Sequence, residues 1–465
     1  MEDRNPADVG DVVALFPAMQ RSDVENAVNA AARAFPAWRA ADWVKRGEFL
    51  KRTAQLLRER AESIARDLAR EMGKTLREAR TEVVKAADFF EYYGSLGRLP
   101  VGNLLPDARA GVTTISTREP LGVVVAITPW NDPLLTPARK LAPALVAGNT
   151  VILKPSSLTP LSAWHLIKAL HDAGVSDGVA NLVTGSGSSL VETLVGHPEV
   201  RAVTFTGSTE VGLQLQKMAA GRNIRVQTEM GGKNALVVLR DANLDLAADL
   251  AVTGAFAQAG QRCTATSRII VEDAVHDPFL EKMAERTKAM RIGPGLDERT
   301  DMGPVVDQGQ LDTVLEFVEG ACREGASLAV GGRRLTGEPY DRGYFVEPTI
   351  FTDVQPSMTI AQKEVFGPVV AVMRVGSFDE AVEVVNGTRY GLSASVVTRS
   401  LESAHRFAAE VDVGCVGVNV PTAGWDVHIS FGGFKDSGSA FREQGLEALQ
   451  FYTRVKSVAM QVMGI

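Results

Sequence analysis

Residues 122–155 read GVVVAITPWNDPLLTPARKLAPALVAGNTVILKP. Two β-branched runs, GVVVAIT and NTVILKP, enclose a stretch that is rich in alanine and leucine. A short apolar strand, a helix and a second apolar strand form the unit from which parallel sheets are built. Further β-branched runs follow at AVTFTGS (202–208) and NALVVL (234–239), with helical stretches between them. The alternation predicts an α/β fold with a parallel sheet and crossover helices.

The flanking sequence predicts three further regions. From residue 21 to about residue 98, apolar side chains recur at three- and four-residue spacing, which indicates helices. Beyond residue 260 we expect a second α/β half, with strands near SRIIVE, PVVAVMRV and ASVVT. Segments 111–121 and 451–460 have strand character, and we expect them to pair with each other or with the sheet edge of another subunit.

Composition restricts the possible function. The chain has 465 residues, enough for about three domains, and its net charge of −7 includes no basic block, so no nucleic-acid partner is expected. Three cysteines without a CxxC pair predict neither a disulfide framework nor a zinc site. Neither a secretion signal nor an apolar stretch of about eighteen residues is evident. We therefore expect a cytoplasmic protein without a metal or a membrane partner.

Cys263 is the first candidate for chemistry. It ends the tetrapeptide GQRC, on a loop of small and polar residues that leads into the strand SRIIVE. A nearby cation or helix dipole lowers the pKa of a thiol and raises its thiolate fraction, as a nucleophile requires. The alternative is a buried small hydrophobe. We assign that alternative to Cys322 and Cys415.

Two polar residues and a glycine-rich turn are further candidates. Glu229 precedes the Gly-Gly turn of QTEMGGKN, where a carboxylate can act as a general base or can simply be a surface acid. Asn131 follows the strand GVVVAIT, where its amide can stabilise an oxyanion or form a turn. The stretch FTGSTEVG (205–212) leads from a strand into a helix and can bind an anion, although it is not a GxGxxG motif.

Seven motifs in one order identify a family resemblance. They are PWN (129–131), LKPSS (153–157), FTGSTEVG (205–212), EMGGK (229–233), GQRC (260–263), EVFGPV (364–369) and FGGFKDSG (431–438). Their order, and the 34 residues from Glu229 to Cys263, closely resemble the NAD(P)-dependent aldehyde dehydrogenase superfamily over nearly the whole chain. The chain is also expected to lack the short strand that commonly precedes the family's N-terminal Asn-Pro dipeptide.

The resemblance implies an architecture. It predicts an atypical Rossmann dinucleotide-binding domain (1–100 and 122–230), an α/β catalytic domain (231–445) and a β bridging element (101–121 and 446–465). The bridging strands are expected to extend a neighbouring subunit's sheet, which would give a homodimer or homotetramer.

The resemblance also implies a mechanism. Cys263 would attack the aldehyde carbon, and the Asn131 amide with the Cys263 backbone N–H would hold the oxyanion. After hydride transfer, Glu229 would activate the water that hydrolyses the thioester.

The resemblance places seven residues around NAD(P). Lys154 would contact the adenosine ribose, and Ser208 and Trp130 would lie at the pyrophosphate. Gly207 and Gly212 belong to the turn that approaches it. Glu364 would bind the nicotinamide ribose, and Phe366 would wall the nicotinamide.

Departures from the family pattern bear on specificity. Ser157 occupies the position where members selective for NAD carry a glutamate that repels a 2′-phosphate, so we expect NADP to be accepted and preferred. Arg139 stands where many relatives carry an aromatic residue, and a guanidinium there could pair with a substrate carboxylate or sulfonate, or with a structural acid. Arg262 is a second candidate cation. Asp132 and Asp436 depart from the pattern without a predicted role.

The C-terminal stretch from 419 to 458 and GQRCTATSRIIV are most similar to α-ketoglutaric semialdehyde dehydrogenases, whereas Arg139 is also a feature of succinate-semialdehyde dehydrogenases. The expected substrate is therefore an acidic semialdehyde. The alternatives are succinate semialdehyde, sulfolactaldehyde and a neutral or aromatic aldehyde. A binding protein on the same fold is a more distant alternative, against which the presence of Cys263, Asn131 and Glu229 together argues. An acyl-transfer enzyme that uses the same cysteine is another, against which the dinucleotide elements Lys154, Ser208 and Glu364 argue.

Overall fold

The computed structural model describes residues 1–99 and 101–461, so residue 100 and residues 462–465 of the expected domain ranges lie outside it. Its first sheet has five parallel strands in the order β7-β6-β5-β8-β9. Their bounds are β5 Val123–Ile127, β6 Thr150–Lys154, β7 Ala180–Leu182, β8 Val200–Thr206 and β9 Arg225–Glu229. The predicted strand–helix–strand unit around PWN is confirmed as β5, α5 (Leu135–Val146) and β6.

Alternate side chains of this sheet enter two separate apolar cores. Val124 and Ala126 of β5 pack in one core with α2 to α6, whereas Val123 and Val125 pack in another with α1, α7 and α8. This two-sided burial follows from the two-residue period of a strand and explains why the strand sequences are almost continuously apolar. The crossover helices are α6 Pro160–Asp172, α7 Ser188–Gly196 and α8 Thr209–Ala220.

The predicted N-terminal helical region is confirmed. It consists of α1 Arg21–Ala40, α2 Trp43–Glu59, α3 Ala61–Met72, α4 Leu76–Ser95 and the short η1 Leu96–Arg98. Helix α4 begins with a capping box in which Thr75 and Glu78 each satisfy a backbone N–H of the other. The expected absence of an N-terminal strand is wrong, because β1 (Glu2–Asn5) precedes Pro6 and pairs antiparallel with β2 (Asp8–Leu15).

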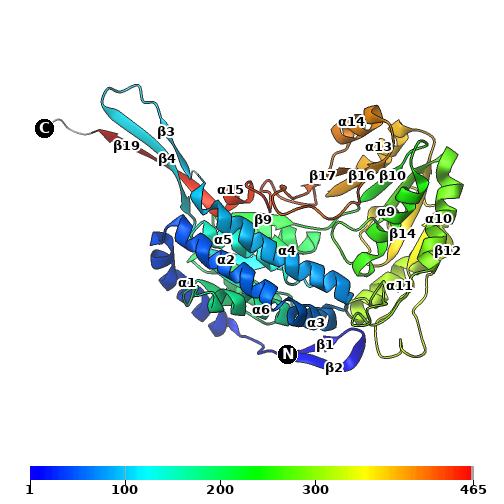
Figure 1. Ribbon diagram of the computed structural model, residues 1–465, viewed down its shortest axis with the longest axis horizontal. Helices are drawn as coiled ribbons and strands as arrows, with labels where there is room; N and C mark the ends of the chain where they lie inside the picture. The colour runs from blue at the N-terminus through cyan, green and yellow to red at the C-terminus, as the bar shows by residue number, and fades with distance from the viewer. Residues whose placement is uncertain (100, 462–465) are drawn as a thin grey trace.

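The second α/β half forms a seven-stranded sheet in the order β12-β13-β14-β11-β10-β16-β17, with β12 as its antiparallel edge. Its strands are β10 Ala235–Val238, β11 Arg268–Glu272, β12 Ser327–Val330, β13 Thr349–Thr352, β14 Val369–Val375, β16 Ser393–Val397 and β17 Cys415–Val418. Its helices are α9 Leu244–Phe256, α10 His276–Lys288, α11 Gln308–Arg323, α12 Thr359–Gln362, α13 Phe378–Asn386 and α14 Leu401–Glu410, with η2 Ala257–Gly260 and η3 Asp273–Val275 between them. Figure 1 shows this half on the side of the molecule opposite the N-terminal helices.

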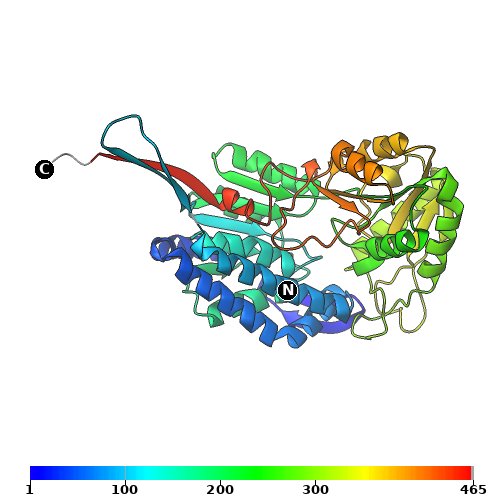
Figure 2. The same ribbon diagram turned by 45° about the horizontal axis from the view of Figure 1, so that its top comes forward.

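Three strands form an arm that projects from the body in both views (Figures 1 and 2). The arm contains β3 Gly102–Leu105, β4 Val112–Pro120 and β19 Thr453–Gln461, which follows α15 (Ala448–Tyr452). Strands β4 and β19 pair antiparallel from Thr453↔Pro120 to Gln461↔Val112, so the two distant segments do pair with each other. The small pair β15 Tyr390–Gly391 and β18 Phe434–Lys435 completes the sheets. Within the described residues, no helix is long and apolar enough to cross a membrane.

Candidate active site

A cavity of about 350 Å³ lies between the two α/β halves. Three kinds of segment line it: the loop after β5 with Trp130 and Asn131, the loop after η2 with Cys263, and the segment 423–431. Because β5 to β9 are parallel, their carboxyl ends meet at one edge, where ligands bind in open α/β sheets. The cavity therefore brings the predicted Asn131 and Cys263 together.

The loop that carries Cys263 has an unusual backbone. Gln258, Ala259 and Gly260 have φ values of 53°, 54° and 68°. A left-handed conformation is costly for a non-glycine residue and persists only where its surroundings hold it. A Cβ on Gly260 would overlap the carbonyl of Gly367, so the close approach requires glycine. The Asn234 Nδ2 donates to the Cys263 carbonyl at 2.7 Å and fixes the loop beyond the turn.

The Cys263 thiol is surrounded by charges of both signs. It packs beside a small apolar cluster of Leu392, Cys415 and Phe431. Burial raises the pKa of the thiol, the negative charge of Asp132 raises it further, and the Arg139 guanidinium opposes both. The nucleophile is therefore a thiol in this arrangement, and its ionisation depends on the balance of those charges.

Glu229 ends β9 and is buried beneath the cavity. Its carboxylate accepts hydrogen bonds from Gln227 Nε2 at 3.2 Å and from the Gly433 backbone N–H at 3.3 Å. Burial, together with the charge of Glu443, raises its pKa well above the usual range. Glu229 is not among the residues that line the cavity, so it must turn toward Cys263 before it can act on a water there.

A buried cluster of charges includes Arg139. Both Arg139 and Lys140 of α5 bind the Glu443 carboxylate, Arg139 through Nη1 at 3.1 Å and Lys140 through Nζ. Although burial opposes ionisation of Glu443, the two cations keep the pKa of its carboxyl below the usual range. The Arg139 guanidinium also lies over the Phe431 ring at 4.9 Å and lines the cavity. Arg139 therefore has a structural acid as a partner and a surface toward the substrate space.

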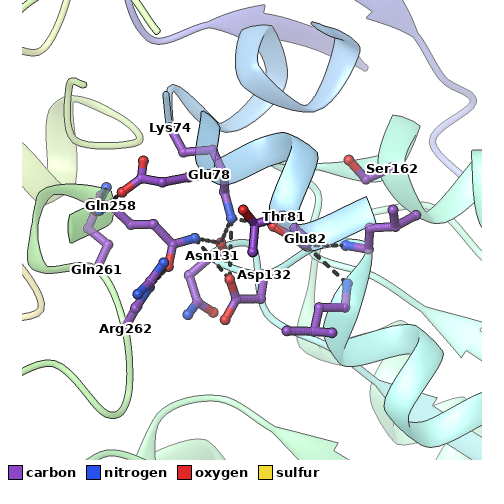
Figure 3. A network of polar contacts seen from close by, with 12 residues as sticks. Lys74, Glu78, Thr81, Glu82, Asn131, Asp132, Ser162, Gln258, Gln261 and Arg262 are labelled. Atoms are coloured by element: carbon purple, nitrogen blue, oxygen red, sulfur yellow. Dashed lines mark hydrogen bonds and ion pairs between the residues drawn. The ribbon is translucent and has the colours of Figure 1, made fainter. Parts of the chain in front are cut away.

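Arg262 also lines the cavity, and its Nε donates to Gln258 Oε1. Figure 3 shows the polar network to which this contact belongs. Gln258 Nε2 donates to Asp132 Oδ1 at 2.9 Å, and Lys74 Nζ reaches the same oxygen at 3.3 Å. The sequence did not single out Lys74, Gln258 or Glu443.

The residues expected around the dinucleotide divide into two groups. Trp130, Gly207, Ser208, Glu364 and Phe366 line the cavity, whereas Lys154, Ser157 and Gly212 lie outside its lining. The rings of Trp130 and Phe366 meet edge to face with centroids 5.3 Å apart.

Ser208 caps α8, and its hydroxyl accepts the Val211 N–H at 3.4 Å. A side chain on Gly207 would collide with Phe205, and one on Gly212 with Met230. These two glycines therefore let Phe205 and Met230 pack directly against the start of α8.

Glu364 is partly exposed at the cavity wall, and the neighbouring Lys233 is buried. The Glu364 carboxylate accepts the Gly232 N–H at 3.0 Å, and burial raises its pKa to about 7, against the opposing effects of that hydrogen bond and of Lys233. Burial likewise lowers the pKa of Lys233 to about 7. Across residues 1–99 and 101–461, no group of three or more His, Cys, Asp and Glu side chains is arranged to hold a metal ion.

Comparison with known proteins places this geometry in context. The model of the aldehyde dehydrogenase family matches residues 1–458. The α-ketoglutaric semialdehyde dehydrogenase of Bacillus subtilis is 44% identical over 454 residues, which cover 98% of this chain and 93% of that protein. The α-ketoglutarate semialdehyde dehydrogenase of Haloferax volcanii is 45% identical over 456 residues, covering 98% of this chain and 94% of that protein.

A solved structure also matches over the whole chain. The betaine aldehyde dehydrogenase of Staphylococcus aureus, in complex with NAD⁺, superposes with a TM-score of 0.97 at 34% identity. The match covers 100% of this chain and 92% of that one. The likeness extends over both α/β halves and the arm.

Proposed function

Because the chain belongs to the aldehyde dehydrogenase family, we propose that it oxidises an acidic semialdehyde, such as α-ketoglutaric semialdehyde, through a thioester on Cys263. The observation that carries the proposal is one cavity lined by Asn131, Cys263 and Arg139. It joins an oxyanion donor, a nucleophile and a cation that can bind a distal carboxylate.

The chemistry begins when Cys263 loses its proton to solvent and the sulfur attacks the aldehyde carbon. The Asn131 amide and the Cys263 backbone N–H donate to the oxygen on which charge develops. NAD(P)⁺, when bound, would supply the acceptor for the hydride of that carbon. The oxygen, still held by the Asn131 amide, then returns to a carbonyl as the Cys263 thioester forms. Glu229 then turns toward the thioester and takes a proton from the attacking water. The C–S bond breaks, the departing sulfur takes up the proton that Glu229 holds, and the carboxylic acid and the Cys263 thiol are released.

The residues present fit a dinucleotide. The N-terminus of α8 offers backbone N–H groups next to Gly207 and Ser208, which line the cavity, and such groups suit a pyrophosphate. Lys154 lies at the end of β6 and is nearly buried, and among the described residues its ammonium donates only to the adjacent Pro155 carbonyl, at 3.3 Å. It can therefore turn to a ribose hydroxyl or a phosphate.

Cofactor preference follows from Ser157. Its side chain is neutral and short, so it does not repel a 2′-phosphate as a glutamate would. Together with the Lys154 ammonium, it favours NADP over NAD. The ratio of kcat/KM values for the two dinucleotides tests this preference, and turnover with NAD alone would contradict it.

The substrate class follows from the charge around Arg139. Two cations, Arg139 and Lys140, share the single carboxylate of Glu443. The cluster then has an excess positive charge, which a substrate carboxylate would neutralise. Arg262 adds a second cation to the cavity wall.

The projecting arm supports self-association. Leu104 and Val455 on its strands are 74% and 61% exposed. We expect these apolar side chains and the free strand edge to be covered by another copy, giving a homodimer or homotetramer. A nucleophilic thiol must also stay reduced, which fits the cytoplasm.

The deciding measurement is kcat/KM for α-ketoglutaric semialdehyde against a neutral aldehyde of similar length, followed by the absorbance of reduced nicotinamide. We expect a preference of about a hundredfold, equivalent to about 2.7 kcal/mol of transition-state binding. Cys263→Ala serves as the control, which abolishes oxidation but retains dinucleotide binding. Equal values for the two aldehydes would refute the acidic substrate and leave the aldehyde dehydrogenase reaction intact.

A further inference from the structure

Asp132 lies in the cavity wall, and the sequence predicts no role for it. It directly follows Asn131, and its side chain is 21% exposed. Two of its neighbours meet at one oxygen: Gln258 Nε2 donates to Oδ1 at 2.9 Å, and Lys74 Nζ lies 3.3 Å from the same atom. Figure 3 shows these side chains converging from α4's N-terminal side and from the Cys263 loop.

The same partners also bind the main chain of the oxyanion donor. Lys74 Nζ donates to the Asn131 carbonyl at 2.8 Å, and Gln258 Nε2 reaches that carbonyl at 3.3 Å. Lys74 is itself paired with Glu82, whose other oxygen accepts the Leu134 N–H at 2.9 Å. The loop that carries Asn131 is thereby fixed at residues 131, 132 and 134.

The other end of the network is the nucleophile's loop. Gln258 has a left-handed backbone, and its N–H donates to Glu78 Oε1 at 2.8 Å. Its side-chain oxygen accepts from Arg262 Nε, one residue before Cys263. The Gln258 amide therefore has both of its ends occupied, with Asp132 on one side and Arg262 on the other.

We propose that Asp132 is a positioning residue that joins the Asn131 loop to the Cys263 loop through Gln258 and so holds the oxyanion donor and the nucleophile in register. The inference rests on the proposed function, because that function assigns Asn131 and Cys263 their catalytic roles. Asp132 touches neither the thiol nor the developing oxyanion in this scheme. It acts through Gln258 and Lys74.

The charge of Asp132 has a separate, measurable effect. Burial opposes its ionisation, but Lys74, Arg262, Arg139 and the Gln258 amide keep the pKa of its carboxyl below the usual value. Ionised Asp132 in turn raises the pKa of Cys263, as Glu364 and Glu229 also do, while Arg139 opposes them. Loss of the carboxylate should therefore increase the thiolate fraction while weakening the link between the loops.

Replacement of Asp132 should thus slow oxidation but speed modification of the thiol, and a residue with only a structural role would not give these two opposite changes. In Asp132→Ala, we expect kcat/KM for aldehyde oxidation to fall by about tenfold to a hundredfold, because small misplacements of reacting groups are costly. We expect alkylation of Cys263 by iodoacetamide at pH 7 to become faster, by about threefold or more, and its pH profile to move to lower pH. Asp132→Asn retains an acceptor for Gln258. Its kcat/KM for aldehyde oxidation should therefore fall less than that of Asp132→Ala, while the rate of Cys263 alkylation should rise by a similar factor in both variants.

Gln258 provides the second half of the test. If the two residues act through their contact, Asp132→Ala combined with Gln258→Ala should cost no more in kcat/KM than the worse single variant. Asp436→Asn is the matched control, because Asp436 pairs with Arg389 at 2.7 Å and does not line the cavity. Its oxidation and alkylation rates should stay within about twofold of the parent.

Two results would overturn the proposal. Oxidation by Asp132→Ala within twofold of the parent would show that the link does not position the loops. A parallel fall of oxidation, alkylation and melting temperature in both Asp132 variants would show a general loss of structure. Activity that survives in Cys263→Ala would instead overturn the proposed function, so the two failures are distinguishable.

Discussion

Replacement of Arg139 by methionine separates substrate binding from support of the fold. Methionine keeps an unbranched apolar side chain between Phe89 and Phe431, whose ring centroids lie 5.6 and 4.9 Å from the guanidinium carbon. Glu443 keeps Lys140 as a partner in this variant, so the buried carboxylate is not left without a cation. The structure therefore predicts a change mainly in what the cavity binds.

The size of the effect follows from the hydrogen bonds that Arg139 can still make. One bond goes to Glu443 at 3.1 Å, the Arg139 Nε is buried, and the 14% of the side chain that stays exposed is available to the cavity that Arg139 lines. A charge-assisted hydrogen bond contributes about 1.5–3 kcal/mol. We therefore expect Arg139→Met to lower kcat/KM for an acidic semialdehyde by about 10- to 150-fold, with much less effect on a neutral aldehyde of equal length.

The assay follows reduced nicotinamide at saturating dinucleotide for both aldehydes, with thermal melting of each variant as the measure of folding. Arg139→Lys is the informative companion, because it retains the charge but loses the planar fork and the contact with the rings. The fall in kcat/KM for the acidic substrate should be smaller in Arg139→Lys than in Arg139→Met. An equal fall for both aldehydes would assign Arg139 to structural support of Glu443 and refute its role toward the substrate.

Three other outcomes follow from the site. Glu229→Gln should stop thioester hydrolysis and leave a burst of about one reduced nicotinamide per active site in stopped flow; steady turnover without a burst would exclude Glu229 as the base of deacylation. Ser157→Glu should shift the ratio of kcat/KM values from NADP toward NAD, and an unchanged ratio would remove Ser157 from cofactor selection. Burial raises the pKa of Glu364 to about 7, and its carboxyl is a full hydrogen-bond acceptor only when it is ionised. The KM for the dinucleotide should therefore rise as the pH falls below about 7, and Glu364→Gln should abolish this pH dependence.

The strand and helix pattern was predictable because local sequence decides it. The apolar runs at 123–127 and 150–154 are β5 and β6, and the polar residues just beyond such strands lie at the cavity, as Asn131 does. The parallel arrangement brings strand ends to one edge regardless of loop detail. The strand β1 was missed because its four residues, Glu2–Asn5, carry no apolar run.

Side-chain partners across long sequence separations were not predictable in the same way. Helix α5 places Arg139 and Lys140 side by side among apolar residues, and a buried cation needs an acid. That requirement indicates that a partner exists, yet it does not select Glu443, which lies 304 residues from Arg139. The choice depends on how the C-terminal segment packs over β8, where Thr206 also donates to Glu443 at 3.1 Å.

The link between Asp132 and Gln258 illustrates the same limit at the site itself. Each residue is ordinary in its local sequence, and 126 positions separate them. Only the left-handed turn at Gln258 and Ala259 presents the amide to Asp132, and strand or helix propensity does not predict such a turn. Sequence motifs therefore locate the reacting residues, because the reaction requires particular side chains such as the Cys263 thiol and the Asn131 amide. The residues that hold the reacting atoms in place are chosen by packing, so they emerge only when the two halves of the chain are seen together.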